Sequence, residues 1–298
     1  MTSKSRMLRL AATLSCSIAL AAGAGAALPA NASNANASNA NASKGSAAFL
    51  GVWNYQTPDP ATGLNIAVVG GHGFTEDFPQ IGWVDFTRGR NGQVTGRTDQ
   101  GCTWQFAVKA GELQLAYPGQ QCFNKVIGSR YQMNRWTVSV NGNTEREYIQ
   151  ATSFLPSGSY TFTLAHGDRT RATQDATADY AGHWTFSPAN PRTGVNMETV
   201  VSSTGKAAER PVSGSVSITR SGKVIHARTA NGCVWKLDVD GNTAELAGKQ
   251  TCRLAGGSTQ TYSFWSMAVG GGHVYAAMSG STNAGEFSLA TGLLTRSI

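Results

Sequence analysis

The chain contains the same unit twice. Two motifs of its first half, Gly-x-Trp and Arg-Thr-x-x-Gly-Cys-x-Trp, return in its second half at one spacing of about 130 residues. A repeated unit of this length predicts two domains of one type, which we place at 47–172 and 173–298, joined by the polar stretch 170–179. The main repeated pairs are Gly51/Gly182, Trp53/Trp184, Arg97/Arg228, Cys102/Cys233, Trp104/Trp235, Cys122/Cys252 and Trp136/Trp265.

Within each unit, apolar and polar residues alternate with a period of two. Cys102, Trp104, Phe106 and Val108 share one face of a strand, and the matching stretch of the second unit alternates in the same way. Only 14% of the residues are charged and 35 are glycine, which is typical of β structure with many turns. Neither unit shows a convincing amphipathic helix. The sequence therefore predicts an all-β fold of two tandem antiparallel barrels.

Short alternating segments bounded by turn residues give the remaining strands. The turn after the first cysteine strand falls at Ala110-Gly111, and its counterpart is Asp240-Gly241-Asn242, a strong hairpin signal because tight turns need positive φ. Further strands are expected at Ile66–Val69, Gly82–Phe86, Trp136–Val140, Tyr160–Leu164, Val212–Thr219, Thr261–Val269 and Val274–Met278.

The N-terminus has the layout of a secretory signal peptide. Basic residues Lys4, Arg6 and Arg9 precede an apolar stretch at 10–22, and small residues offer cleavage after Ala26 or Ala32. We assign 1–32 to this segment. An alternative is a lipid anchor on Cys16, but Thr13 stands where a Leu-like residue is needed. No later apolar run reaches the roughly 18 residues of a spanning helix, so no membrane span is expected.

Residues 33–46 continue an Asn/Ala/Ser repeat and are expected to form a disordered linker, because they have no aromatic and no branched apolar side chain with which to build a core. The repeat contains Asn-x-Ser sequons at Asn31, Asn36 and Asn41, which a eukaryotic secretory pathway would glycosylate. The Ala- and Gly-rich signal segment is typical of bacteria, which favours a linker over a glycosylated segment.

The cysteines indicate one disulfide in each domain. Of the 5 cysteines, Cys16 leaves with the signal peptide, and the other four fall at equivalent positions of the two units. Export through an oxidising compartment favours the pairs Cys102–Cys122 and Cys233–Cys252. A zinc site is the alternative, but the four cysteines lack the short Cys-x2-Cys spacing of such sites, so no metal and no cofactor are expected.

The opening Gly-x-Trp of each unit resembles the first strand of the calycin group, which includes lipocalins and avidin-like barrels. In that group the Trp closes one barrel end beneath an Arg from another strand. The resemblance implies structural pairs of Trp53 with Arg97 and of Trp184 with Arg228, in which a guanidinium lies over an indole ring. Each domain is accordingly expected to be a calycin-like barrel.

Two further resemblances concern the cysteines. The interval between them, followed by a Trp about 13 residues later, is similar to that of small β-barrel inhibitors of secreted bacterial metalloproteases, which implies a protease-inhibitor function. Gly-Cys-x-Trp and Gln-x-Cys also occur in this order in secreted repeat proteins of myxobacteria and actinomycetes. That resemblance implies secretion and disulfides but no particular function.

Catalytic motifs are sparse. None of the 5 histidines forms His-x-His or HExxH, and no nucleophile elbow or phosphate-binding glycine fingerprint occurs. The most polar cluster is Gly70–Phe78, in which His72, Glu76 and Asp77 lie in a Gly-rich stretch expected to be a mobile loop at a barrel mouth. It is a candidate site for ligand binding through His72, or for catalysis by all three residues; the alternative is a solvated surface loop.

A few side chains of the first unit have no repeat partner. Trp83 and Tyr117 are candidate binding residues for a sugar or an apolar ligand, the alternative being a plain core role. Glu145 and Glu147 share one face of a strand, as an acid–base pair would, but with Arg135 and Arg146 nearby we interpret them as salt-linked surface charge.

These observations favour a secreted, non-enzymatic binding protein. The repeated residues are framework types, and no His, Asp or Glu recurs in both units. The expected partner is a small apolar molecule, a glycan or an extracellular protein, held at barrel mouths or loops. The alternatives are an extracellular hydrolase using the 70–78 segment and an inhibitor of secreted proteases. The signal peptide supplies part of the formal charge of +7, so nucleic acid is not an expected partner.

Overall fold

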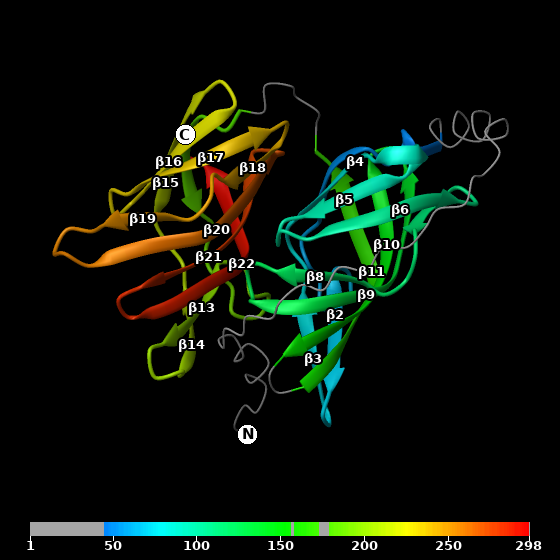
Figure 1. Ribbon diagram of the computed structural model, residues 1–298, viewed down its shortest axis with the longest axis horizontal. Coiled ribbons are helices and arrows are strands. Elements are labelled where there is room, and N and C mark those ends of the chain that lie inside the picture. Colours follow the sequence, from blue (N-terminus) through cyan, green and yellow to red (C-terminus); the bar gives the residue numbers. More distant parts are fainter. Residues whose placement is uncertain (1–44, 156–157, 173–178, 298) are drawn as a thin grey trace, which may run out of the picture.

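The computed structural model describes residues 45–155, 158–172 and 179–297, so the predicted signal peptide and most of the linker lie outside the described part. Its elements there are strands, apart from the 3₁₀ turn η1 (Arg90–Gly92). The strands form two closed antiparallel barrels of eight strands each, which confirms the predicted fold class. Figure 1 shows the two barrels side by side, the first in blue to green and the second in yellow-green to red.

Barrel 1 closes when β1 pairs with both β4 and β11, the hydrogen-bonded order being β1-β4-β5-β6-β7-β9-β10-β11. Its strands, together with three that lie outside the closed ring, are β1 (Gly51–Tyr55), β2 (Ile66–Gly71), β3 (Phe74–Pro79), β4 (Trp83–Arg88), β5 (Val94–Thr98), β6 (Thr103–Lys109), β7 (Glu112–Leu115), β8 (Gln120–Asn124), β9 (Ser129–Asn141), β10 (Thr144–Leu155) and β11 (Gly158–Arg171).

Barrel 2 repeats this topology, with the order β12-β15-β16-β17-β18-β20-β21-β22 and closure between β12 and β22. Its strands are β12 (Gly182–Phe186), β13 (Met197–Ser202), β14 (Ala207–Pro211), β15 (Ser215–Ser221), β16 (Val224–Thr229), β17 (Val234–Asp240), β18 (Thr243–Leu246), β19 (Gln250–Arg253), β20 (Thr259–Gly270), β21 (His273–Thr282) and β22 (Gly285–Arg296).

Three strands of barrel 1 are longer than the barrel itself. The C-terminal end of β11 pairs with β1 through Arg169–Arg171, whereas its N-terminal half pairs with β2 through Thr161–Leu164. In the same way, the start of β9 pairs with β8. The projecting halves of β9, β10 and β11 pair there with β8, β2 and β3 in the same sheet, and we call this region the extension. It continues the barrel wall past one open end.

The expected loop at 70–78 is a hairpin instead. The strands β2 and β3 pair from Ile66↔Pro79 to Gly71↔Phe74, and His72 at the turn has φ 51°. The expectation of a mobile loop was wrong because Val68 and Val69 on one side and Phe78 on the other supply enough apolar residues to continue the strands through the glycines.

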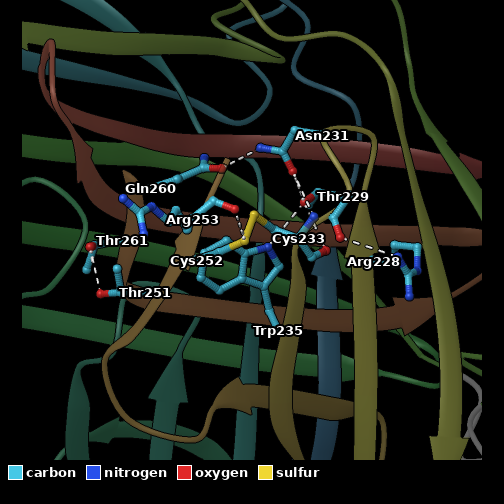
Figure 2. The surroundings of a disulfide bond; sticks show 11 residues. Arg228, Thr229, Asn231, Cys233, Trp235, Thr251, Cys252, Arg253, Gln260 and Thr261 are labelled. Atoms are coloured by element: carbon cyan, nitrogen blue, oxygen red, sulfur yellow. Dashed lines mark hydrogen bonds between the residues drawn. A yellow bond between two sulfur atoms is a disulfide. The ribbon is translucent and has the colours of Figure 1, made fainter. Parts of the chain in front are cut away.

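Both predicted disulfides are present. Cys102–Cys122 ties the start of β6 to β8, and Cys233–Cys252 ties the start of β17 to β19. Figure 2 shows the second bond beside Trp235, with Asn231 bridging to Gln260 through a hydrogen bond of 2.6 Å. Each bond anchors a strand of the extension, or of its counterpart, to the barrel.

The outer face of barrel 2 packs against barrel 1. Ala268 of β20 joins Val52, Trp83 and Ala172 of barrel 1 in one buried apolar cluster, and a second cluster unites Val126 with Phe264 and Ala277. Polar contacts accompany this packing.

Glu245 lies 3.4 Å from Arg97 and 3.0 Å from Lys125. The hydroxyl of Ser266 donates to the carbonyl oxygen of Asp99. Among the described residues, no helix is long and apolar enough to cross a bilayer.

Candidate functional site

A cavity of about 1130 Å³ opens from the interior of barrel 1. Its inner wall includes Tyr55, Trp104 and Trp136 of the barrel, and the extension contributes Phe123 and Phe162. The far wall belongs to barrel 2, where residues of its strands β13, β21 and β22 line the cavity. The cavity is therefore shared by the two domains and is mostly aromatic and aliphatic where it enters barrel 1.

Barrel 2 is filled at the corresponding place. Tyr262 lies at the centre of an aromatic stack, 4.5 Å from Trp235, 5.1 Å from Trp265 and 5.3 Å from Phe287 between ring centroids. Tyr262 pairs with Gly280 across β20 and β21, and the same register position in barrel 1 is the pair Met133 and Ala151. Because a Met replaces the central ring, barrel 1 has room that barrel 2 lacks.

A charged cluster lies beneath the cavity floor in barrel 1. Glu145, Glu147 and Arg169 project into the barrel and are almost fully buried. The Arg169 guanidinium lies 3.1 Å from Glu145 and also contacts Glu147. It is further surrounded by rings, with Tyr55 at 4.9 Å and Trp136 at 5.5 Å from their centroids. The cluster therefore unites an ion triad with cation–π contacts.

Glu147 links this cluster to the cavity floor. It accepts hydrogen bonds from the Tyr55 hydroxyl at 2.5 Å and from the Trp136 indole at 2.7 Å. Both rings line the cavity, so Glu147 fixes the floor on which a ligand would rest. Burial raises the pKa of the Tyr55 hydroxyl to about 12, which keeps Tyr55 neutral as a hydrogen-bond donor.

Burial also raises the pKa of Glu145 to about 7, against the attraction of Arg169. Glu145 and Glu147 share one strand face, as predicted, but the interpretation as surface charge was wrong. Along β10 that face continues through Ile149 and Ala151, which are buried in the barrel. Two features of the sequence indicate that both glutamates point into the barrel. They are the alternation that continues from Glu145 to Ala151 and the alignment of Trp136 with Trp265.

Four buried polar atoms among the cavity-lining residues have no hydrogen-bond partner among the described residues. They are Trp83 Nε1, Asp99 Oδ2, Ser129 Oγ and Thr193 Oγ1. Each unpaired buried polar atom costs about 1–3 kcal/mol. Sequence reasoning did not single out Asp99 and Thr193, which lie in turns, or Ser129, which is the first residue of β9.

The 70–78 candidates do not converge on one point. His72 sits at the hairpin turn with its ring 5.2 Å from that of Tyr160. Glu76 lines the cavity, whereas Asp77 pairs with exposed Val68 on the opposite face of the hairpin. The structure therefore does not bring the three side chains together as a catalytic group. Of the two aromatic candidates, Trp83 lines the cavity and Tyr117 is 57% exposed outside that lining.

The Trp–Arg pairs involve other arginines than those expected. The guanidinium over Trp53 belongs to Arg171 at 4.0 Å, and the one over Trp184 belongs to Arg296 at 4.9 Å. Both come from the last strand of their barrel, which lies next to the first strand once the barrel closes. Strand adjacency across the closure was not visible from the motif spacing.

The arginines that were expected in these pairs lie elsewhere. Arg97 stacks on Trp83 at 5.2 Å instead. Arg228 donates to the carbonyl oxygen of Gly232 at 3.3 Å, close to the disulfide in Figure 2.

Comparison with known proteins yields no family model that matches the chain and no matching curated protein. Among solved structures, a candidate outer membrane protein from Bacteroides fragilis is 11% identical, with a TM-score of 0.27, over 85% of this chain and 99% of its own. A DUF3598 family protein of unknown function from Nostoc punctiforme is 11% identical, with a TM-score of 0.26, over 86% of this chain and 98% of its own. At such TM-scores these similarities support no functional argument.

Proposed function

We propose that this protein is a secreted binding protein that holds a small, largely apolar molecule in the cavity of barrel 1. The observation that carries this proposal is the difference between the barrels. Barrel 1 has a cavity of about 1130 Å³ where barrel 2 is packed with aromatic rings around Tyr262. Pockets of several hundred cubic ångströms, lined by aromatic side chains with a few polar groups, are typical of small-molecule sites.

The composition of the cavity favours a small apolar molecule over a glycan or a protein. The part within barrel 1 is lined by rings such as Tyr55, Trp104 and Trp136, and reaching it requires a ligand narrow enough to enter a barrel. The disulfide in each barrel agrees with passage through an oxidising compartment, which supports the proposed secretion.

A fluorescence titration tests the proposal. A neutral phenylnaphthylamine probe becomes bright in an apolar cavity, and binding near Trp104 and Trp136 should quench tryptophan emission. Mass spectrometry of the purified protein under native conditions would also detect a ligand that is retained during purification.

The decisive variant gives barrel 1 the side chains that fill barrel 2. Met133→Tyr combined with Ala151→Gly introduces the pair found at Tyr262 and Gly280, and it should weaken probe binding at least about tenfold because the ring occupies the cavity. Tyr117→Ser changes an exposed ring outside the cavity lining and should leave binding unchanged. A folded double variant that binds the probe as well as the parent would contradict the proposal.

A further inference from the structure

We propose that the outer face of β8, β9 and β10 binds an acidic glycan, that is, a polysaccharide whose sugars carry carboxylate groups. This face is a second site on barrel 1, and its function does not depend on the one proposed for the cavity. The proposal is carried by the charges, the aromatic rings and the amide groups that these three neighbouring strands expose.

The charge on this face is positive. The only two acidic residues of the three strands are the glutamates buried inside the barrel with Arg169. The arginines of the same strands are all exposed and alternate with buried positions, namely Arg130, Arg135 and Arg146. Arg146 lies 3.8 Å from Asp168 of β11, whereas the other two arginines form no ion pair within the described part of the chain. The face therefore offers two cations to an anionic partner.

Aromatic rings lie beside both of these arginines. Strand register places Arg130 between Phe123 of β8 and Phe154 of β10, which are 60% and 40% exposed. The Arg135 guanidinium lies 4.9 Å from the ring centroid of Tyr148. Because neighbouring strands lie about 4.8 Å apart, the backbones at the two phenylalanines are roughly 10 Å apart, which leaves room for successive sugar rings. Phe123, Arg130 and Phe154 also belong to the cavity lining, so this end of the face lies where the cavity meets solvent.

Amide groups occupy the part of the face between the two arginines. Gln121 donates to Gln132 at 3.3 Å, Gln132 donates to Asn134 at 2.9 Å, and Asn134 donates to Thr152 at 3.0 Å. This chain of hydrogen bonds orients the amides, and each amide keeps further donor or acceptor capacity for sugar hydroxyls. A lipid surface would instead cover these groups without giving them partners, which costs free energy. The face therefore favours a glycan over a membrane.

Barrel 2 uses the equivalent face in another way. By strand register, Arg135 and Tyr148 of barrel 1 correspond to Phe264 and Ala277 of barrel 2. Both of the barrel 2 residues are buried with Val126 in the contact between the domains. The duplicated fold therefore accepts apolar side chains at these positions and does not need the arginine or the tyrosine.

The combination of groups favours an acidic glycan over a neutral one. A guanidinium can hold a carboxylate through two parallel hydrogen bonds, and Arg130 and Arg135 are both exposed. The apolar face of a sugar ring can cover an exposed aromatic ring, while its hydroxyls bond to the amides. A neutral glycan makes the last two kinds of contact and leaves the arginines unused.

Calorimetric titration with polygalacturonate and alginate tests this inference. The matched ligand is methyl-esterified polygalacturonate, which keeps the chain and removes its charge. The parent should bind the acidic chain at least about tenfold more tightly than the ester, and Arg130→Gln with Arg135→Gln should reduce this preference to about twofold. Arg192→Gln with Arg253→Gln, two exposed arginines of barrel 2, changes the net charge equally and should keep the preference.

Several outcomes would overturn the inference. They are no binding of either acidic chain, equal binding of the ester, and a preference that both pairs of variants reduce equally. Capture by phosphatidylserine vesicles without binding of either glycan would assign the face to a membrane and overturn it too. Urea denaturation should show parent-like stability for the variants, because the side chains are exposed. A parent that binds the acidic chain but not the phenylnaphthylamine probe would contradict the proposed function alone.

Discussion

Arg169 of β11 and Leu294 of β22 occupy the same position in their barrels. Arg169 pairs with Tyr55 two residues from the Trp53–Arg171 pair, and Leu294 pairs with Phe186 two residues from the Trp184–Arg296 pair.

The residues near Arg169 and Leu294 on the neighbouring strand also differ in charge. Glu145, opposite Arg169, corresponds to Val274, opposite Leu294, and Glu147 corresponds to Ala276. One duplicated barrel therefore has an ion cluster where the other has apolar side chains, so closure of the barrel does not require the charges.

The first prediction follows from this correspondence. Replacing one member of a buried ion cluster leaves unpaired charge, so Arg169→Leu alone should lower the free energy of unfolding by about 3–5 kcal/mol. Replacing the whole cluster by its barrel 2 counterparts, with Glu145→Val, Glu147→Ala and Arg169→Leu together, should be neutral or stabilising by about 1–4 kcal/mol. Urea denaturation measures both values.

The combined variant also loses the hydrogen bonds that fix Tyr55 and Trp136, so its affinity for the probe should fall although its stability does not. If it proved as unstable as Arg169→Leu alone, the cluster would be needed for the fold and the comparison between the barrels would fail.

A second prediction concerns pH. The pKa of Glu145 is raised by burial to about 7 from 4.5, so the native protein binds a proton that the unfolded chain has released in this window. The free energy of unfolding should therefore be highest near pH 4.5 and decrease as the pH rises to about 7, by at most about 1.4 kcal/mol per pH unit from this group.

Glu145→Gln provides the control, because an amide does not titrate. Its stability should vary less with pH over the same window, which urea denaturation at several pH values would show. Asp99, whose pKa is also raised by burial, should leave part of the slope in this variant. Stability that rises with pH in the parent would contradict the prediction.

The third prediction separates the two disulfides. They close segments of similar length, with sequence separations of 20 and 19, so the loss of either one by paired Cys→Ala changes should cost about 3 kcal/mol. Only Cys102 lies in the cavity lining, with Asp99 three residues before it and Phe123 next to its partner Cys122. Removing Cys102–Cys122 should therefore weaken probe binding, whereas removing Cys233–Cys252 should not. Equal losses of affinity would show that the cavity depends on overall stability.

The features that could be predicted from the sequence are those that follow from alternation along a strand and from the repeated unit. The alternation around Trp104 placed its strand correctly, and the repeated spacing of the cysteines gave both disulfides. Trp83 was recognised as a candidate from its lack of a repeat partner, and it lies in the cavity lining.

The features that could not be predicted depend on contacts between residues that are far apart in the chain. Arg171 meets Trp53 only when the last strand closes the barrel, and the cavity owes one wall to strands of barrel 2. The environment of Glu147 is set by Tyr55, which lies 92 residues away in the chain. Local patterns contain no information on such pairs, so the glutamates were assigned to the surface from their charge and from the arginines near them in the chain.

The last prediction concerns the closure of barrel 1. Arg171 lies over Trp53 at 4.0 Å and donates to the backbone carbonyl oxygens of Leu50 and Ala48. Loss of a cation–π contact together with charged hydrogen bonds should make Arg171→Leu less stable by about 2–4 kcal/mol.

Arg97→Leu is the matched change. The Arg97 side chain is 26% exposed and its ion pairs are partly solvated, so this variant should lose about 1 kcal/mol or less. Urea denaturation of the two variants would distinguish them. A larger loss for Arg97→Leu than for Arg171→Leu would show that the domain contact at Glu245, and not the first and last strands, limits the stability of barrel 1.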